Sequence, residues 1–285
     1  MIYFERVGQV LRVAQEIKSP SVYLDHWALR EISESDELAC RFSRFLRSHG
    51  GTLVLSWLNV VEFCKVADAA QRRKADLLIH GLFPNLFWLN PDFFTVEKNE
   101  RMSGTQQLLP CLPHSDLDLA YTYVRIALRN SVKPRSLRSQ NIFTAIHSIP
   151  DIPKQYDELA DLIVSQIEWL RTRYENTKAM QAKLRALPKR QVISRGTRLI
   201  AREFIGRFLN DRLLRPSRND AIDLSHAVVS VSYCDYALLD GHWVAPINNF
   251  RRRIAKAGVS LPMAKVFSKR ANGVEEFLSE LSGKT

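Results

Sequence analysis

Four aspartates lie within one short, mostly apolar stretch near the C-terminus. They are Asp220, Asp223, Asp235 and Asp240. Asp220 and Asp223 are three residues apart at the expected start of a helix, so their side chains share one face. Asp235 and Asp240 flank the apolar run 236–239, which is long enough for a core strand. Carboxylates gathered at the ends of buried elements repel one another unless a cation lies among them. The stretch therefore indicates a Mg²⁺ or Mn²⁺ site.

Two acidic residues far upstream are candidates for the same centre. Asp25 follows the apolar run 21–24, and Glu62 lies in an apolar helical pattern after the next expected strand. In a parallel α/β sheet, ligand sites form beyond the carboxyl ends of the strands, where Asp25 and Asp240 are expected. Hard divalent cations held by such carboxylates activate water and stabilise the charge of a phosphodiester under attack. We therefore expect a catalytic set of Asp25, Glu62, Asp223 and Asp240, with Asp220 as an alternative ligand.

Each of these acids also has a plain structural alternative. Asp220 is a natural helix N-cap, and Asp223 in the first turn could complement the helix dipole. Asp25 could be a turn residue, and Glu62 could form a structural salt bridge. The sequence leaves these alternatives open.

Two residues of the same stretch are expected to support the ligands rather than to bind the cation. Asp235 is better placed to cap the loop before its strand than to contact a metal. His226 lies three residues after Asp223 and could orient a carboxylate, although a core or capping histidine is the commoner case.

Positive charge is concentrated in two stretches of the chain. The net charge of the chain is +11. Residues 170–218 contain fourteen Lys or Arg and three Asp or Glu, so the net charge of this segment alone is equal to that of the whole chain. Basic residues beside a carboxylate cluster favour a polyanionic substrate, although a solvated basic helix face is the alternative. We expect six arginines to contact nucleic acid: Arg195, Arg198, Arg202, Arg251, Arg252 and Arg253.

Alternating strand and helix patterns predict an α/β fold with a central, mostly parallel sheet flanked by helices. The middle of the chain carries long helical patterns and no convincing strand, which predicts a large all-helical insertion. Apolar spacing over residues 3–17 predicts a further helix at the N-terminus. The predicted organisation is an N-terminal helix at 1–19, an α/β core from 20–95 and 216–285, and a basic helical insertion at 96–215.

The order of the acidic motifs resembles that of the PIN-domain superfamily of metal-dependent nucleases. In that pattern an Asp ends the first strand, a Glu follows the second strand, an Asp begins a later helix, and an acid follows the fourth strand. The matching segments are Val22-Tyr-Leu-Asp25, Asn59-Val-Val-Glu62, Asn219-Asp220-Ala-Ile-Asp223-Leu-Ser-His226 and Cys234-Asp235-Tyr-Ala-Leu-Leu-Asp240. The resemblance implies that the four acids bind or orient metal, and that the protein could be a homodimer.

Composition excludes several other classes. No apolar run reaches the length of a membrane span, and the first residues do not resemble a secretory signal. The four cysteines are far apart without zinc-ligand spacing, which favours a reduced, cytoplasmic protein. No phosphate-binding loop of the G-x-x-x-x-G-K-[ST] type is present.

The combined expectation is a nuclease that cleaves phosphodiester bonds, with RNA favoured over DNA. Two alternatives stay open. One is a catalytically inactive PIN-like module that binds nucleic acid or protein. The other is a component of a toxin or defence system whose basic helices bind a neutralising partner protein.

Overall fold

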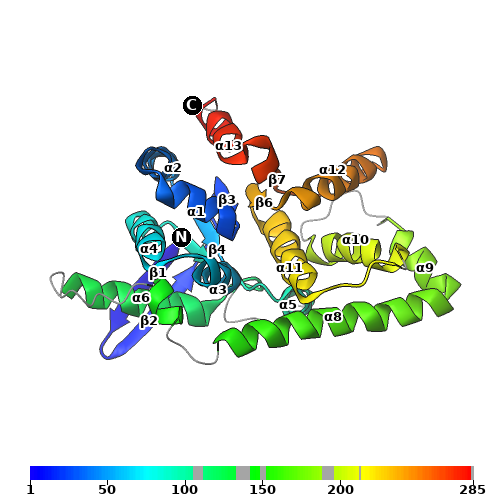
Figure 1. Cartoon of the computed structure of the whole chain (residues 1–285). Helices are drawn as coiled ribbons and strands as arrows, with labels where there is room; N and C mark the ends of the chain where they lie inside the picture. The colour runs from blue at the N-terminus through cyan, green and yellow to red at the C-terminus, as the bar shows by residue number, and fades with distance from the viewer. Residues whose placement is uncertain (105–111, 133–141, 148–151, 188–195, 212, 284–285) are drawn as a thin grey trace.

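A computed structural model describes residues 1–285 apart from 105–111, 133–141, 148–151, 188–195, 212 and 284–285 (Figure 1). The described elements are β1 (Ile2–Val7), β2 (Val10–Gln15), β3 (Ser21–Leu24), α1 (His26–Glu34), α2 (Asp36–Ser48), β4 (Thr52–Leu55), α3 (Trp57–Val66), α4 (Ala69–Leu82), β5 (Leu86–Trp88), α5 (Phe93–Gly104), α6 (Leu117–Val132), α7 (Ile142–His147), α8 (Ile152–Asn176), α9 (Lys178–Arg185), α10 (Thr197–Asn210), α11 (Arg218–Tyr233), β6 (Tyr236–Leu239), α12 (Gly241–Lys256), β7 (Lys265–Ser268), the 3₁₀ turn η1 (Lys269–Ala271) and α13 (Gly273–Ser282).

The core is a five-stranded sheet in the order β5-β4-β3-β6-β7, and every neighbouring pair is parallel. The three inner strands, β4, β3 and β6, are buried along their whole length, with Val22, Tyr23 and Leu24 at 0% exposure. The sequences of such strands are continuous apolar runs, because helices cover both faces of the sheet. The predicted α/β fold class is therefore confirmed.

Helices from distant parts of the sequence surround the carboxyl edge of this sheet. One residue separates β3 from α1, β4 from α3 and β6 from α12. α11 precedes β6 and packs against it, and it also contacts α8 and α10 of the predicted insertion. In Figure 1, α8, α9 and α10 extend to one side of the sheet, while α6 and the β1–β2 hairpin lie on the other. The insertion thus reaches the carboxyl edge through α8 and α10.

The predicted N-terminal helix is wrong, because residues 2–15 form an antiparallel hairpin. Gly8 has a φ of 62° in the tight turn, a conformation that glycine adopts without steric cost. The side chain of Gln15 then attaches the hairpin to β5. It donates to the carbonyl of Trp88 at 2.8 Å and accepts from the N–H of Trp88 at 2.8 Å. Spacing of apolar residues alone does not separate a helix from a hairpin that is largely solvent-exposed.

Within the described part of residues 96–215, the secondary structure is helical apart from one β-bridge between Leu89 and Ser115 at its border. The long helical pattern in the middle of the chain is interrupted at Thr177, which separates α8 from α9. Across the described ranges, none of the helices has the length and apolar composition that crossing a membrane would need.

Candidate metal centre

Asp25 lies where β3 ends and α1 begins. Its backbone is extended, and its Oδ1 accepts a hydrogen bond from the backbone N–H of His26 at 2.6 Å, which caps the helix. The same oxygen is 3.0 Å from Nδ1 of the His26 ring, and the residue is only 4% exposed. Asp25 is therefore held in one orientation at the carboxyl edge of the sheet.

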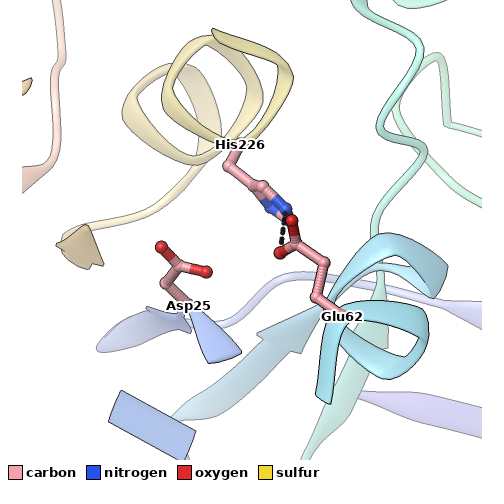
Figure 2. A group of neighbouring side chains, drawn as sticks. All are labelled: Asp25, Glu62 and His226. Atoms are coloured by element: carbon pink, nitrogen blue, oxygen red, sulfur yellow. Dashed lines mark hydrogen bonds and ion pairs between the residues drawn. The ribbon is translucent and has the colours of Figure 1, made fainter. Parts of the chain in front are cut away.

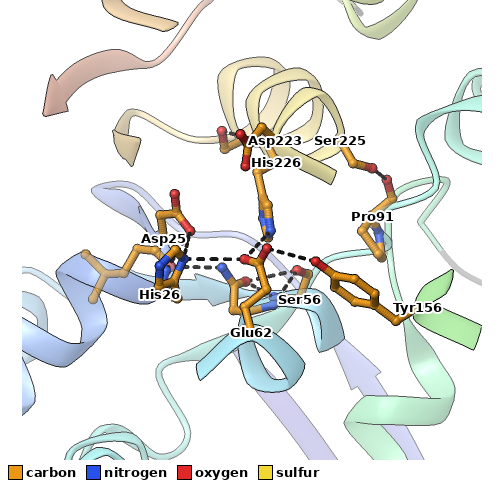
Figure 3. Close-up of polar contacts among 12 residues, drawn as sticks. Asp25, His26, Ser56, Glu62, Pro91, Tyr156, Asp223, Ser225 and His226 are labelled. Atoms are coloured by element: carbon orange, nitrogen blue, oxygen red, sulfur yellow. Dashed lines mark hydrogen bonds and ion pairs between the residues drawn. The ribbon is translucent and has the colours of Figure 1, made fainter. Parts of the chain in front are cut away.

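Glu62 projects from α3 toward the same edge and contacts side chains from three other elements. Its Oε2 is 3.0 Å from Nε2 of His226 on α11 and 3.5 Å from Nδ1 of His26 on α1. Its Oε1 accepts a hydrogen bond from the hydroxyl of Tyr156 on α8 at 3.2 Å. Figure 2 shows Glu62 and His226 pointing toward each other beside Asp25, and Figure 3 adds Tyr156 on the opposite side.

Charge complementarity stabilises the ionised form of Glu62. Burial opposes its ionisation, but the imidazoles of His226 and His26 outweigh that effect and hold its pKa well below the usual value. Conversely, hydrogen bonds to Asp25 and Glu62 raise the pKa of His26 to about 10. Burial lowers the pKa of His226, yet the neighbouring Glu62 raises it overall to about 9. At neutral pH the ionised Glu62 is therefore paired with two imidazolium ions.

His226 is fixed from its other side by the central strand. The ring is 1% exposed, and its Nδ1 is hydrogen-bonded to the hydroxyl of Tyr23 on β3. A partner on one ring nitrogen orients the ring and presents the other nitrogen to its ligand. Tyr23 thereby directs Nε2 of His226 at Glu62.

Asp223 and Asp240 form a second acidic pair next to the first group. Asp223 lies in the second turn of α11, and its Oδ2 is 3.8 Å from Nε2 of His242 on α12. Asp240 ends β6 and occupies the N-cap position of α12, but its side chain makes no capping hydrogen bond. Its carboxylate is therefore not committed to the helix end.

These two carboxylates are destabilised in their ionised forms. Burial, followed by the charges of Asp25, Glu62 and Asp240, raises the pKa of Asp223 to about 7, although His226 partly offsets this. Burial and the charge of Asp25 also raise the pKa of Asp240. The acids are thus close enough to repel one another, and a divalent cation among them would relieve the repulsion.

The donor atoms fall into two sets, each with its ligand atoms within 4.8 Å of one another. One set is Asp25, Glu62 and His226, and the other is Asp223, Asp240 and His242. Carboxylate oxygens predominate in both, as hard cations such as Mg²⁺ and Mn²⁺ prefer. Chemically, the arrangement can hold one or two divalent ions at the carboxyl edge of the sheet.

The structure brings together all four acids of the expected catalytic set, with His226 as the expected supporting residue. It places Asp220 differently. Asp220 forms a reciprocal capping box with Ser217, whose N–H and hydroxyl donate to its carboxylate at 2.9 and 2.6 Å. The N-cap is Ser217 rather than Asp220 as expected, and Asp220 supports the cap from the third helical position. Among the described residues, Asp220 belongs to neither donor set.

Asp235 does not support the metal ligands, and it has the structural role that was its alternative. Its Oδ2 accepts hydrogen bonds from the hydroxyl of Ser19 and from the N–H and hydroxyl of Ser21, at 2.6, 2.8 and 2.9 Å. Ser21 begins β3, whereas Asp25 follows its end, so the two edges of the sheet are about 13 Å apart. Asp235 connects β3 to β6 at the opposite edge.

Most of the arginines expected to bind nucleic acid have partners within the protein. Arg198 is 3.5 Å from Glu97, and Arg253 pairs with Glu203. Three others donate to nearby oxygens: Arg202 to the carbonyl of Ala186, Arg251 to that of Ala264 and Arg252 to the side chain of Asn249. Arg195 lies outside the described residues.

Three contributors to the centre were not expected from the sequence: His26, Tyr156 and His242. The position of His26 directly after Asp25 was an available signal, because a side chain at the first helical position stays close to its N-cap. His242 follows Asp240 in a similar way. Tyr156 carried no such signal, since it comes from the insertion and lies 94 residues from Glu62.

Comparison with known proteins identifies no relative of this chain. No protein-family model matches the chain, and the searches of curated proteins and of solved structures find no match.

Proposed function

We propose that this protein is a metal-dependent nuclease that hydrolyses phosphodiester bonds with Mg²⁺ or Mn²⁺, and that RNA is its favoured substrate. One observation carries the proposal. Asp25, Asp223 and Asp240 come from three separate elements and meet at the carboxyl edge of the sheet, where two of them have raised pKa values. Carboxylates that repel one another at a recessed edge are suited to share a hard cation.

The donor set fits such an ion. Asp240 makes no capping hydrogen bond that would compete for its oxygens, and Asp223 is within reach of the same ion. When bound, Mg²⁺ or Mn²⁺ would activate a water molecule and offset charge on the phosphodiester. Asp223 and Asp240 are the residues that would hold it, and Asp25 belongs to the neighbouring donor set, which could hold a second ion.

Glu62 and the histidines have different roles in the proposed reaction. Because its pKa is held low, Glu62 stays ionised and accepts hydrogen bonds, which suits the orientation of a water molecule better than the uptake of a proton. The side chain of His26 is 32% exposed, and its raised pKa keeps it cationic at neutral pH. His26 can therefore offset negative charge on a substrate phosphate.

The resemblance to PIN-domain nucleases supports the same activity, because the four acids occur in the corresponding order. We extend the proposal to a cytoplasmic location, since Cys40, Cys64 and Cys234 are free thiols. That the protein forms a homodimer, and that it binds a neutralising partner protein, remain predictions.

The test is a cleavage assay on single-stranded RNA and DNA, with Mn²⁺ or EDTA, for the wild type, Asp25→Ala and Asp240→Asn. We expect cleavage that requires Mn²⁺ and that both substitutions abolish. As a matched control, Asp235→Asn should cleave normally, because Asp235 lies at the other edge of the sheet. Cleavage that survives in both Asp25→Ala and Asp240→Asn would refute the proposed centre.

One observation favours an inactive binding module as the second candidate. Glu62 is already paired with two imidazoles and a tyrosine, so this acid is neutralised without a cation. An inactive module should show neither Mn²⁺-dependent cleavage nor a shift of its melting temperature with Mn²⁺, whereas a nuclease should show both.

A further inference from the structure

Two arginines outside the expected nucleic-acid set contact the first turn of α12, directly after Asp240. The guanidinium of Arg207, on α10, lies 5.3 Å from the ring centroid of Trp243. The side chain of Arg270, on η1, packs against Gly241 so closely that an added Cβ there would lie 3.0–3.3 Å from its Cγ, Cδ and Nε. Both cations are therefore held beside the acid that ends β6.

The two arginines approach this turn from different sides. Gly241 and Trp243 are two residues apart, which corresponds to about 200° around a helix. Arg207 and Arg270 thus contact different sides of the first turn of α12, which begins directly after Asp240.

Neither guanidinium is neutralised in the part of the chain that the structure describes. Both residues are exposed, and no ion pair or hydrogen bond joins either one to another described residue. Asp220, an acid whose charge reaches Arg207, is itself engaged with Ser217. This distinguishes the pair from Arg198 and Arg253, which have carboxylate partners.

Arg207 is also held in place before any ligand arrives. Trp243 is 2% exposed, and the ring of Phe204 packs against it with a centroid separation of 5.1 Å. An arginine over a fixed aromatic ring loses less freedom on binding than a mobile one. The burial of Trp243 also means that this ring cannot stack on a base.

We propose that Arg207 and Arg270 form a phosphate clamp that holds a single-stranded polynucleotide across the first turn of α12. The two arginines bind the phosphates on either side of the scissile bond. This inference rests on the proposed function and names its substrate class. Guanidinium groups suit phosphates because their donors match the phosphate oxygens. A single strand can bend around one helical turn, whereas a duplex is stiff on this length scale. Asp25, at 4% exposure, is also recessed, which favours a flexible strand.

The test measures binding and cleavage in parallel on the full chain. Anisotropy of a labelled single-stranded RNA 12-mer in Ca²⁺ buffer, between about 50 and 200 mM salt, gives affinity and salt dependence for the wild type, Arg207→Gln and Arg270→Gln. Arg73→Gln is the matched control, because Arg73 is an exposed arginine on α4, which lies away from α12 (Figure 1). Cleavage with Mn²⁺ is measured on the same samples.

We expect each clamp variant to bind at least tenfold more weakly. Its slope of log affinity against log salt should fall by about 0.7, and Arg73→Gln should bind like the wild type. Thermal melts check folding. Because Arg207 packs on Trp243, Arg207→Lys is a second variant that should largely keep the salt slope.

The outcomes separate this inference from the proposed function. Clamp variants that bind like Arg73→Gln overturn the clamp, even if the wild type cleaves RNA. A wild type that fails to bind either RNA or DNA overturns it as well, and so does equal affinity for a duplex. A wild type that binds through both arginines without cleaving would support the clamp and refute the nuclease.

Discussion

Asp223 is expected to destabilise the protein in the absence of metal, and Asp223→Asn tests this directly. The carboxyl group is 27% exposed, and burial together with the charges of Asp25, Glu62 and Asp240 raises its pKa from 3.8 to about 7. At about 1.4 kcal/mol per pH unit, this shift corresponds to about 4 kcal/mol of unfolding free energy. Asparagine has nearly the same shape and no charge, so it removes this penalty.

The sign of the pH dependence follows from the direction of the shift. Below the unfolded pKa of 3.8 the carboxyl group is protonated in both states and carries no penalty. As the pH rises toward about 7, the unfolded chain releases the proton while the folded protein retains it, so the free energy of unfolding falls. Above about pH 7 the full penalty applies.

The assay is thermal unfolding of the wild type and Asp223→Asn at pH 4.5 and pH 8, in EDTA. At pH 8 we expect the variant to melt about 10 °C higher, at roughly 2–4 °C per kcal/mol for a chain of this size. At pH 4.5 the difference should be small. Mn²⁺ at about 100 times its Kd should then stabilise the wild type by about 2.7 kcal/mol and the variant by much less.

A variant that melts below the wild type at pH 8 in EDTA would refute the electrostatic reasoning. Equal stabilisation of both proteins by Mn²⁺ would refute the assignment of Asp223 as a ligand. The control variant is Asp235→Asn, which removes a carboxylate without changing the metal centre. Asn219→Asp would not serve as a control, because it adds a charge near the start of the helix that carries Asp223.

Two further predictions concern neighbours of Asp223. Asp220→Ala should lower the free energy of unfolding by about 1 kcal/mol, because it removes the capping box of α11. The variant should still be stabilised by Mn²⁺ as much as the wild type. Loss of that stabilisation would show that Asp220 is a metal ligand. The pairing of His226 with Glu62 should stabilise the protein fully below about pH 6.5 and lose its effect as the pH rises through about 9, because the pKa of His226 is raised from 6.5 to about 9 in the folded state. Melting curves of the wild type and His226→Gln in EDTA should therefore converge between pH 6.5 and 9, and a gap that widens over this range would contradict the pairing.

Much of the fold was predictable because its central strands are buried on both faces. Apolar runs such as Val22–Leu24 and residues 236–239 have few structural alternatives when polar residues bound them. The N-terminal hairpin was not predictable in this way, because most of its residues are exposed and little burial constrains their pattern. The position of Asp25 was predictable, but the helix that begins at His26 was missed.

Residue type and chain order indicated which acids could bind a cation. Asp25, Glu62, Asp223 and Asp240 follow or precede recognisable elements, and parallel strands place those positions at one edge. Local sequence could not separate Asp220 from Asp223, because both lie on one face of the same helix start. Their roles diverged only when Ser217 engaged Asp220 and left Asp223 facing the other acids.

The composition and order of residues were sufficient to establish the kind of core, its buried strands and the acids at their ends, because these depend on local patterns and on burial. Packing between distant segments settled the electrostatic state of the centre. Tyr156 and His226 reach Glu62 across 94 and 164 residues of sequence, and Arg207 reaches the turn after Asp240 from the insertion. Charge interactions depend on distances of a few ångströms, and those distances exist only once the helices have packed around the edge of the sheet.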